Sequence, residues 1–190
     1  ILDKMLFSLH WLRLWMLCVG SYWNLVVDLR NAPVTYLLAR GKRRGMPKDG
    51  GSQRRVERLA RVLDLACVPS PHLRIGAREE ALAHHLIPDG GPILAVGPTA
   101  NWQAKTWRSE YFAELISRLT GPLGILPEGR VAIFGRDDER PMALRLIDEI
   151  PEKRCIDLVG KIDLLSAYAC LGRCTLYVGN DSGLMHLAAA

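Results

Sequence analysis

The sequence predicts an α/β protein with parallel, doubly wound sheets. In its second half, short apolar runs alternate with longer segments whose apolar residues recur at helical spacing. That alternation is typical of parallel strands joined by right-handed crossover helices. Polar loops containing Gly follow several of the runs, as expected where a strand ends and a helix begins. The predicted strands of this half are residues 93–96, 131–134, 155–158 and 175–178.

Helix signals separate these strands. Ser109 is expected to cap a helix, and its apolar face is formed by Phe112, Leu115, Ile116 and Leu119. Pro141 is placed in the first turn of the next helix, where its missing N–H has no cost. Asp163 is expected to cap a third helix.

The first half is less regular. A helix is predicted over residues 3–19 and a strand over 24–29, and Pro33 opens a helical pattern that continues to residue 40. Residues 41–51 are rich in Gly, Lys, Arg and Pro and predict a loop. Further helices are expected from Ser52 and over residues 78–86. Residues 88–92, Pro-Asp-Gly-Gly-Pro, are the best linker candidate, so we expect two domains, residues 1–90 and 91–190.

Composition suits globular domains with a real core, since 49% of the 190 residues are hydrophobic. The five cysteines are odd in number, and no second pair or His cluster completes a zinc site. We interpret them as reduced thiols in a cytosolic protein. The apolar opening, residues 5–27, contains His10, Arg13 and Asn24, so a buried or partner-facing helix is expected there and not a span of about 20 apolar residues.

Positive charge is concentrated in the first half. Residues 1–91 hold 14 Lys and Arg against 8 Asp and Glu, and much of the excess lies between Arg40 and Arg61. Such a segment can attract nucleic acid, a phospholipid surface or a phosphorylated glycolipid. The alternative is a solvated helix face.

The stretch from Leu176 to Ala190 is the most informative part of the chain. An apolar strand leads into Gly-Asn-Asp-Ser-Gly, and an Ala- and Leu-rich helix follows. This geometry places backbone N–H groups at the carboxyl edge of a parallel sheet, where ligands bind. A phosphate is the group expected to bind there, and Asp181 indicates that the ligand also carries hydroxyls, as a sugar does. Alternatively, Asp181, Ser182 and Gly183 only cap a helix.

A second loop, residues 97–107, follows the first strand of this half and also leads into a helix. It lacks both the Walker pattern and the dinucleotide fingerprint. It does offer a cation, Lys105, close to a helix start, and two such loops on one sheet edge can hold one phosphorylated ligand. Taken alone, Lys105 could equally be a surface lysine, and we interpret Trp107 as a packing residue.

Both loops resemble glycosyltransferase family 9, the lipopolysaccharide heptosyltransferases. Asn101-Trp102 followed by Lys105 and Trp107 is similar to the family's pattern of a small polar residue, Trp-x-x-Lys-x-Trp. The segment Tyr-Val-Gly-Asn-Asp-Ser-Gly-Leu-Met-His-Leu-Ala-Ala, residues 177–189, resembles its D-[ST]-G-x-x-H-x-A-A motif. Residues 134–135 and 158–161 fall where the family has strand-end glycines. The resemblance covers most of the chain and is specific in the second half.

The resemblance implies the GT-B architecture, in which two Rossmann-like domains have the active site between them. Residues 1–90 would be part of the N-terminal, acceptor-side domain, and residues 91–190 part of the C-terminal domain that binds a nucleotide-sugar. The implied reaction is an inverting, metal-independent transfer of a heptose or similar sugar from a donor of the ADP-heptose type. The acceptor would be a lipopolysaccharide core or related glycolipid. No cofactor, metal site or nucleic-acid partner is expected.

The same resemblance implies a set of donor-binding residues: Asn101, Lys105, Ile162, Asp181, Ser182, Gly183 and His186. Lys105 would neutralise the donor diphosphate. Asn101 occupies a position where the family has Ser or Thr near those phosphates, and Ile162 would lie near the adenine.

The remaining residues of the set lie in the second loop and its helix. Asp181 would bind donor sugar hydroxyls, while Ser182 and the Gly183 N–H would meet the diphosphate. His186 lies one turn further on and is interpreted as support for the loop, with direct donor contact as the alternative. On the acceptor side, the resemblance and the basic segment together indicate Arg43 and Arg44.

Two departures from the family are evident. The family begins with a strand and a Gly-rich loop that carries the catalytic base, and residues 1–30 contain no such loop. It also continues past the Ala-rich helix with further strands. We therefore expect an internal fragment with two incomplete domains, a base upstream of Ile1, no catalytic residue within the chain, and no activity of the chain alone.

Two rival functions stay open at this point. A nonhydrolysing sugar-nucleotide epimerase shares the architecture, although its acid and base residues are not evident here. A non-catalytic module that binds a nucleotide or an anionic lipid would fit the basic first half. The expected location is cytoplasmic, with peripheral contact at the inner face of the inner membrane.

Overall fold

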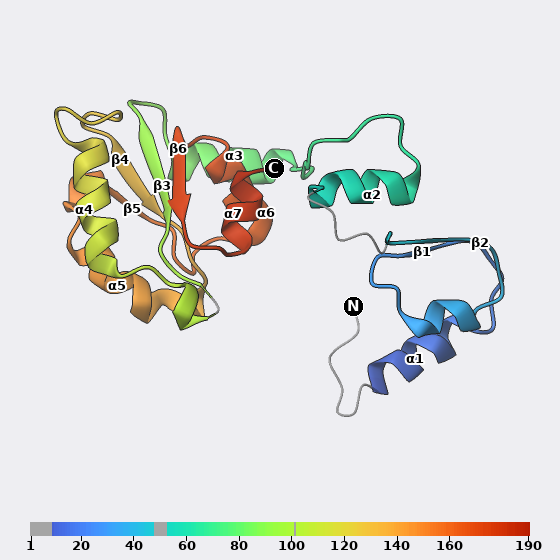
Figure 1. Cartoon of the computed structure of the whole chain (residues 1–190). Helices are drawn as coiled ribbons and strands as arrows, with labels where there is room; N and C mark the ends of the chain where they lie inside the picture. Colours follow the sequence, from blue (N-terminus) through green and yellow to red (C-terminus); the bar gives the residue numbers. More distant parts are fainter. Residues whose placement is uncertain (1–8, 48–52, 101) are drawn as a thin grey trace. The chain divides into compact units, whose positions relative to one another are not determined.

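The computed structural model describes residues 9–47, 53–100 and 102–190 (Figure 1). The chain forms two compact units, Ile1–Pro71 and His72–Ala190. Each contains its own parallel sheet. The division lies earlier than the expected linker at residues 88–92.

The second unit is built on a four-stranded parallel sheet with the strand order β5-β4-β3-β6. The strands are β3 (Ile93–Gly97), β4 (Arg130–Ile133), β5 (Cys155–Asp157) and β6 (Leu176–Gly179). The four predicted strands of this half are therefore present. The helices are α3 (Ala77–Leu86), α4 (Ser109–Thr120), α5 (Arg140–Asp148), α6 (Leu164–Leu171) and α7 (Gly183–Ala188), with short 3₁₀ turns η3 (Gln103–Lys105), η4 (Asp137–Glu139) and η5 (Glu152–Arg154).

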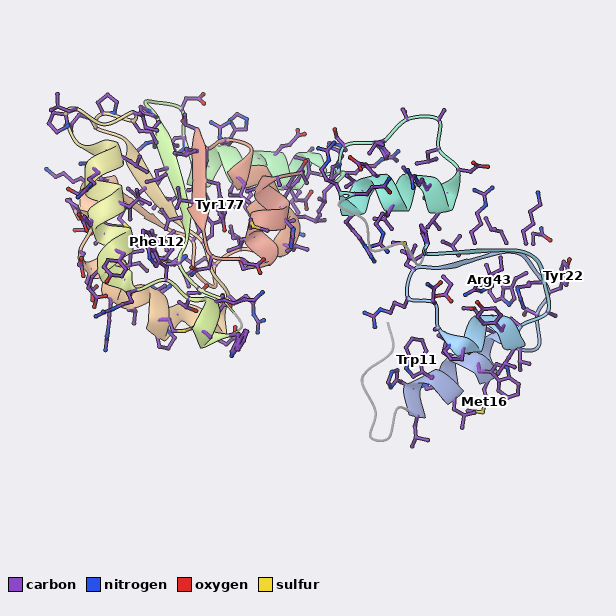
Figure 2. All side chains as sticks on the ribbon, viewed as in Figure 1. Trp11, Met16, Tyr22, Arg43, Phe112 and Tyr177 are labelled. Atoms are coloured by element: carbon purple, nitrogen blue, oxygen red, sulfur yellow. The ribbon has the colours of Figure 1, made fainter. Side chains whose placement is uncertain are left out.

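Helices cover both faces of this sheet, and alternate strand residues point to opposite faces. Leu94 and Val96 belong to a buried cluster with Phe112 of α4 and Leu146 of α5, and Figure 2 shows Phe112 between α4 and the sheet. Ile93 and Ala95, which alternate with these two residues, belong to a second cluster with residues of α3, α6 and α7. The sheet is thus doubly wound, as predicted.

Packing of α3 explains the position of the division between the units. Ala83 and Ile87, at the C-terminal end of α3, are buried in the same cluster as Ala167 and Cys170 of α6. The Arg173 guanidinium donates from Nε to the Ile87 carbonyl at 2.7 Å. Residues 77–86 therefore pack with the second unit, although the expected boundary placed them in the first.

The first unit contains α1 (Leu9–Cys18), β1 (Trp23–Asp28), the 3₁₀ segment η2 (Pro33–Leu37), β2 (Arg40–Gly45) and α2 (Arg55–Leu63). Strands β1 and β2 pair in parallel, with Val26 opposite Arg43. Part of the predicted helix 3–19 and the expected helix start at Ser52 lie outside the described residues. Within them, no helix is both long and apolar enough to cross a bilayer.

Two predictions for this unit are wrong. The helical pattern from Pro33 to residue 40 is only a 3₁₀ segment, and residues 41–45, expected in a loop, belong to strand β2, which begins at Arg40. The sequence of β2, Arg-Gly-Lys-Arg-Arg-Gly, has little intrinsic strand preference. It is a strand because its backbone pairs with β1 and because Arg43 reaches a carboxylate at the end of that strand.

That carboxylate, Asp28, organises the end of β1. It is 4% exposed and accepts hydrogen bonds from Thr35 Oγ1 at 2.7 Å and from Arg43 Nη2 at 2.8 Å. The Arg43 guanidinium also donates to Thr35 and lies 3.9 Å from the centre of the Tyr36 ring. Burial raises the pKa of Asp28, but hydrogen bonds from Thr35, the backbone and Arg43 outweigh it and lower the pKa to about 2.

Asp28 should therefore make the stability of the protein depend on acidic pH. Its pKa is lowered from an ordinary value of 3.8 to about 2, so its contribution is complete above pH 4 and is lost as the pH falls toward 2. The contribution is about 2 kcal/mol. We expect Asp28→Asn to be less stable than the parent at neutral pH, with the difference shrinking between pH 4 and 2 in urea unfolding. A difference that stays constant over that range would contradict the assignment.

Candidate functional site

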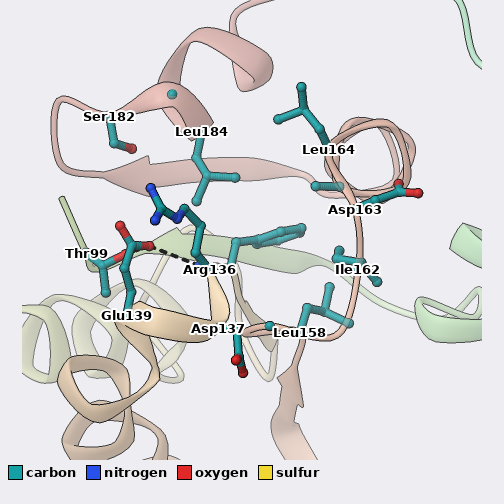
Figure 3. A pocket seen from close by; sticks show the side chains of 15 residues that line it. Thr99, Arg136, Asp137, Glu139, Leu158, Ile162, Asp163, Leu164, Ser182 and Leu184 are labelled. Atoms are coloured by element: carbon teal, nitrogen blue, oxygen red, sulfur yellow. Dashed lines mark hydrogen bonds between the residues drawn. The ribbon is translucent and has the colours of Figure 1, made fainter. Parts of the chain in front are cut away.

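A cavity of about 490 Å³ opens at the carboxyl edge of the four-stranded sheet (Figure 3). It is lined from all four strands, because each of the loops that follow them contributes residues. The volume is within the range of small-molecule sites. The lining residues are Thr99, Phe134, Gly135, Arg136, Asp137, Glu139, Leu158, Gly160, Ile162, Asp163, Leu164, Ala167, Ser182, Gly183 and Leu184.

One wall of the cavity is polar and centred on Glu139. Its Oε2 atom accepts a hydrogen bond from Thr99 Oγ1 at 2.8 Å and another from the Arg136 backbone N–H at 3.0 Å. Thr99 is 1% exposed, so the carboxylate is held by a rigid, buried donor. A carboxylate has about four acceptor positions, and both of these bonds end on one oxygen. Glu139 therefore keeps acceptor capacity for the hydroxyls of a ligand.

The opposite wall is apolar. Figure 3 shows Leu158, Ile162, Leu164 and Leu184 around the cavity. The neighbouring Asp163 caps α6, as predicted, because its Oδ1 accepts from the Ser166 N–H at 2.8 Å. The cavity thus has one hydrogen-bonding wall and one apolar wall.

Gly160 lets the loop after β5 approach the loop after β4. It has φ +72°, in the left-handed region, and an added Cβ would lie 2.8 Å from the Cα of Asp137. Glycine is the residue that adopts this backbone conformation without strain or a steric clash. The close approach narrows the cavity between these two loops.

Lys105 and Asp181 come from the loops after β3 and β6 and form an ion pair. Their side chains are 46% and 58% exposed, and neither residue lines the cavity. The hydrogen bond from Lys105 and the Lys105 charge lower the pKa of Asp181, with a smaller contribution from His186. The two loops predicted to share one ligand therefore do meet.

The side chain of Asn180 connects the same two loops. It is 7% exposed. Its Oδ1 accepts from the Trp107 N–H at 2.9 Å, and its Nδ2 donates to the Pro98 carbonyl at 2.8 Å. Its own backbone N–H donates to the Gly97 carbonyl at 3.1 Å. The side-chain amide thus joins the two loops by one accepted and one donated hydrogen bond.

Ser182 is the N-cap residue of α7, yet its side chain makes no capping hydrogen bond. Its Oγ is buried next to the Tyr177 hydroxyl, without a hydrogen bond of normal geometry to any residue in the described ranges. A serine that served only as a cap would use this hydroxyl on the helix. Ser182 lines the cavity, and its contact with a ligand stays a prediction.

The predicted site residues fall into three groups. Ile162, Ser182 and Gly183 line the cavity, while Lys105 and Asp181 pair at the same sheet edge. His186 is exposed on α7. Asn101 lies outside the described residues.

The two arginines predicted on the acceptor side belong to the first unit. Arg43 is 16% exposed and bound to Asp28, so its charge is matched inside that unit. Arg44 contacts Asp64 at 3.4 Å, and that carboxylate is 83% exposed. The acceptor role of Arg43 and Arg44 stays a prediction.

Three residues of the site were not predicted from the sequence: Thr99, Glu139 and Asn180. In the loop after β4, Arg136 pairs with Asp138. Glu139 could have been noticed because it follows the strand-end Gly135 by one turn. Nothing in the sequence marks Thr99 or Asn180 apart from their positions in the two loops.

Comparisons with known proteins agree with this geometry. The family model described as glycosyltransferase family 9 (heptosyltransferase) matches residues 28–190. Lipooligosaccharide heptosyltransferase 2 of Haemophilus influenzae is 36% identical over 103 residues, which cover 52% of this chain and 28% of that protein. Lipopolysaccharide heptosyltransferase 2 of Salmonella typhimurium is 28% identical over 127 residues, covering 63% and 35%. The chain spans about a third of the length of these curated relatives.

Solved structures show the same fold. The Escherichia coli heptosyltransferase WaaC with ADP-2-deoxy-2-fluoro heptose matches with a TM-score of 0.64 at 21% identity, over 95% of this chain and 62% of that chain. The family 9 glycosyl transferase of Veillonella parvula matches with a TM-score of 0.70 at 18% identity, over 89% and 55%. With the parallel sheets of both units, these matches confirm the predicted α/β fold of the GT-B type. Because the family model matches most of its residues, the chain belongs to glycosyltransferase family 9, the heptosyltransferases.

Proposed function

We propose that the second unit binds a nucleotide-sugar donor of the ADP-heptose type. The protein would transfer the sugar to a lipopolysaccharide core or related glycan. The observation that carries the proposal is the pairing of Lys105 with Asp181 at the sheet edge where the 490 Å³ cavity opens. A cation for a diphosphate and a carboxylate for sugar hydroxyls thus lie in the same place.

The cavity suits the nucleoside part of such a donor. Glu139 can accept hydrogen bonds from ribose hydroxyls, because Thr99 and the Arg136 N–H hold it in place through one oxygen. Ile162 and Leu164, on the apolar wall, offer packing for a flat base such as adenine. The polar and apolar walls would then fix the orientation of the nucleoside.

The diphosphate would engage Lys105. In the free protein this ammonium is neutralised by Asp181, and an exposed ion pair of this kind is worth little. A diphosphate carries more charge than a carboxylate, so it can displace or share the Lys105 contact. The Ser182 hydroxyl, which makes no normal hydrogen bond within the described part of the chain, is a further donor to the ligand.

Asp181 would then be free to bind the hydroxyls of the transferred sugar. During transfer the departing nucleoside diphosphate gains negative charge, and a positioned cation stabilises that charge as it develops. We propose an inverting reaction in which Lys105 plays this part without a metal ion. The acceptor hydroxyl would be activated by a general base.

The comparisons support the donor class. Escherichia coli WaaC has been solved with ADP and with ADP-2-deoxy-2-fluoro heptose, and both structures resemble this chain. A glycolipid acceptor, its contact with Arg43 and Arg44, and a location at the cytoplasmic face of the inner membrane belong to the same proposal. An epimerase or a non-catalytic binding module would bind the nucleotide without transferring sugar. A transfer assay on the full-length protein therefore distinguishes a glycosyltransferase from these two alternatives.

Replacement of Lys105 by alanine should weaken donor binding in the full-length protein. One charge-assisted contact to phosphate is lost, so we expect a cost of about 1–3 kcal/mol in the affinity for ADP. Lys153→Ala is a matched control, because Lys153 is an exposed lysine of the same unit that precedes β5 and so lies at the opposite sheet edge. Equal ADP affinities of the two variants in calorimetry would refute the role of Lys105.

Replacement of Asp181 by asparagine should separate nucleotide binding from transfer. It removes the carboxylate that competes with phosphate for Lys105, so ADP should bind the variant at least as tightly as the parent. Transfer from ADP-heptose should fall, because contacts to the sugar hydroxyls are weakened. The measurements are the ADP dissociation constant and the turnover rate, and a parallel loss in both would count against the proposed division of roles.

A further inference from the structure

A single buried amide closes the loop that carries Lys105. Asn180 bonds both ends of the segment 98–107, through the Pro98 carbonyl at 2.8 Å and the Trp107 N–H at 2.9 Å. Lys105 lies inside this closed segment, two residues before Trp107. The side chain of Asn180, in the loop after β6, therefore holds together the two ends of this segment of the loop after β3.

The attachment of Asn180 to the sheet is rigid. Its backbone N–H donates to the Gly97 carbonyl at 3.1 Å, which continues the pairing of β3 with β6 beyond its last register pair, Gly97 and Gly179. The amide thus begins from a fixed point on two strands. Its side chain bonds to a loop that contains the three-residue turn η3.

Other contacts between the two loops are weaker. The Lys105–Asp181 pair is about half exposed on both sides, and exposed pairs contribute little to stability. The hydrogen bond from Asn180 to the Pro98 carbonyl is buried, and the one from the Trp107 N–H is partly buried. Without Asn180 both backbone groups would lose their partner, which costs more for a shielded group than for an exposed one. The position of Lys105 therefore depends more on Asn180 than on the ion pair that Lys105 itself forms.

We propose that Asn180 is a positioning residue for donor binding, which acts by holding the Lys105 loop so that the ammonium faces the donor diphosphate. The inference rests on the proposed donor site. Asn180 is 7% exposed and does not line the cavity, and its carbonyl oxygen and one amino N–H are bonded to the Lys105 loop. Its effect on binding must therefore pass through that loop.

A double-mutant cycle on the full-length protein tests this coupling. ADP affinity is measured by calorimetry for the parent, Asn180→Leu, Lys105→Ala and the double variant. We expect Asn180→Leu to weaken ADP binding about tenfold in the parent and less than about twofold once Lys105 is alanine, because coupled residues are not additive. If the role of Asn180 were purely structural, Asn180→Leu would weaken ADP binding by the same factor in the parent and in the Lys105→Ala variant.

Thr120→Val is the matched control. Thr120 is 2% exposed and donates to the Ile116 carbonyl at 2.8 Å at the end of α4, so the variant also loses a buried hydrogen bond in this unit. It should lower the melting temperature and leave ADP affinity unchanged. If Asn180→Leu does not fold, Asn180→Ser follows the same design with a smaller loss, because its hydroxyl and a water can satisfy the two backbone groups.

The outcomes separate the inference from the proposed function. One outcome is that the parent protein binds ADP and that Asn180→Leu weakens that binding equally with Lys105 present and with Lys105 replaced by alanine. In that case Asn180 is not a positioning residue, and the proposed donor site stands. If the parent does not bind ADP, the proposed function fails and the inference fails with it. A loss that shrinks in the Lys105→Ala background supports both.

Discussion

Parallel pairing of β3 with both β4 and β6 is the constraint on which the site depends. It sends the loops after these strands to one edge of the sheet, although they are far apart in sequence. The last register pair of β3 and β6 joins Gly97 to Gly179, and the loops that carry Lys105 and Asp181 begin directly after it. Lys105 and Asp181 thus meet because their strands are neighbours and because Asn180 bonds the two loops together. No local sequence signal brings them together.

The ion pair at this edge explains how the free site can hold a cation without a ligand. An ammonium facing empty solvent would be stable but mobile, whereas Lys105 faces the Asp181 carboxylate. Because the pair is exposed, breaking it costs little, and a more highly charged ligand can replace the carboxylate. A site of this kind has its binding groups in position before the ligand arrives, which reduces the ordering cost of binding. In the proposed donor site, the buried Thr99 and the partly buried Glu139 would play the corresponding part inside the cavity.

Periodicity predicted the second unit well, because strands buried on both faces are short apolar runs and their helices have regular apolar faces. It failed for β2, where the residues are basic and the strand is stabilised by pairing with β1 and by Asp28. The position of Lys105, Asp181 and Ser182 at one sheet edge was predictable because they lie in loops that follow predicted strands, and their donor-binding roles stay predictions. Thr99, Glu139 and Asn180 were not predictable, because their roles come from three-dimensional hydrogen bonds that carry no periodic signal.

Both units fix irregular backbone with one buried polar side chain at the end of a strand, but the two side chains differ in charge for a physical reason. Asp28 can be an anion because Arg43 neutralises it inside the first unit. A carboxylate at position 180 would face the Pro98 carbonyl, an acceptor that cannot donate to it. It would also add negative charge next to Asp181 and compete with phosphate for Lys105. A neutral amide both donates and accepts, so Asn180 can join the two loops without altering the charge of the site that they form.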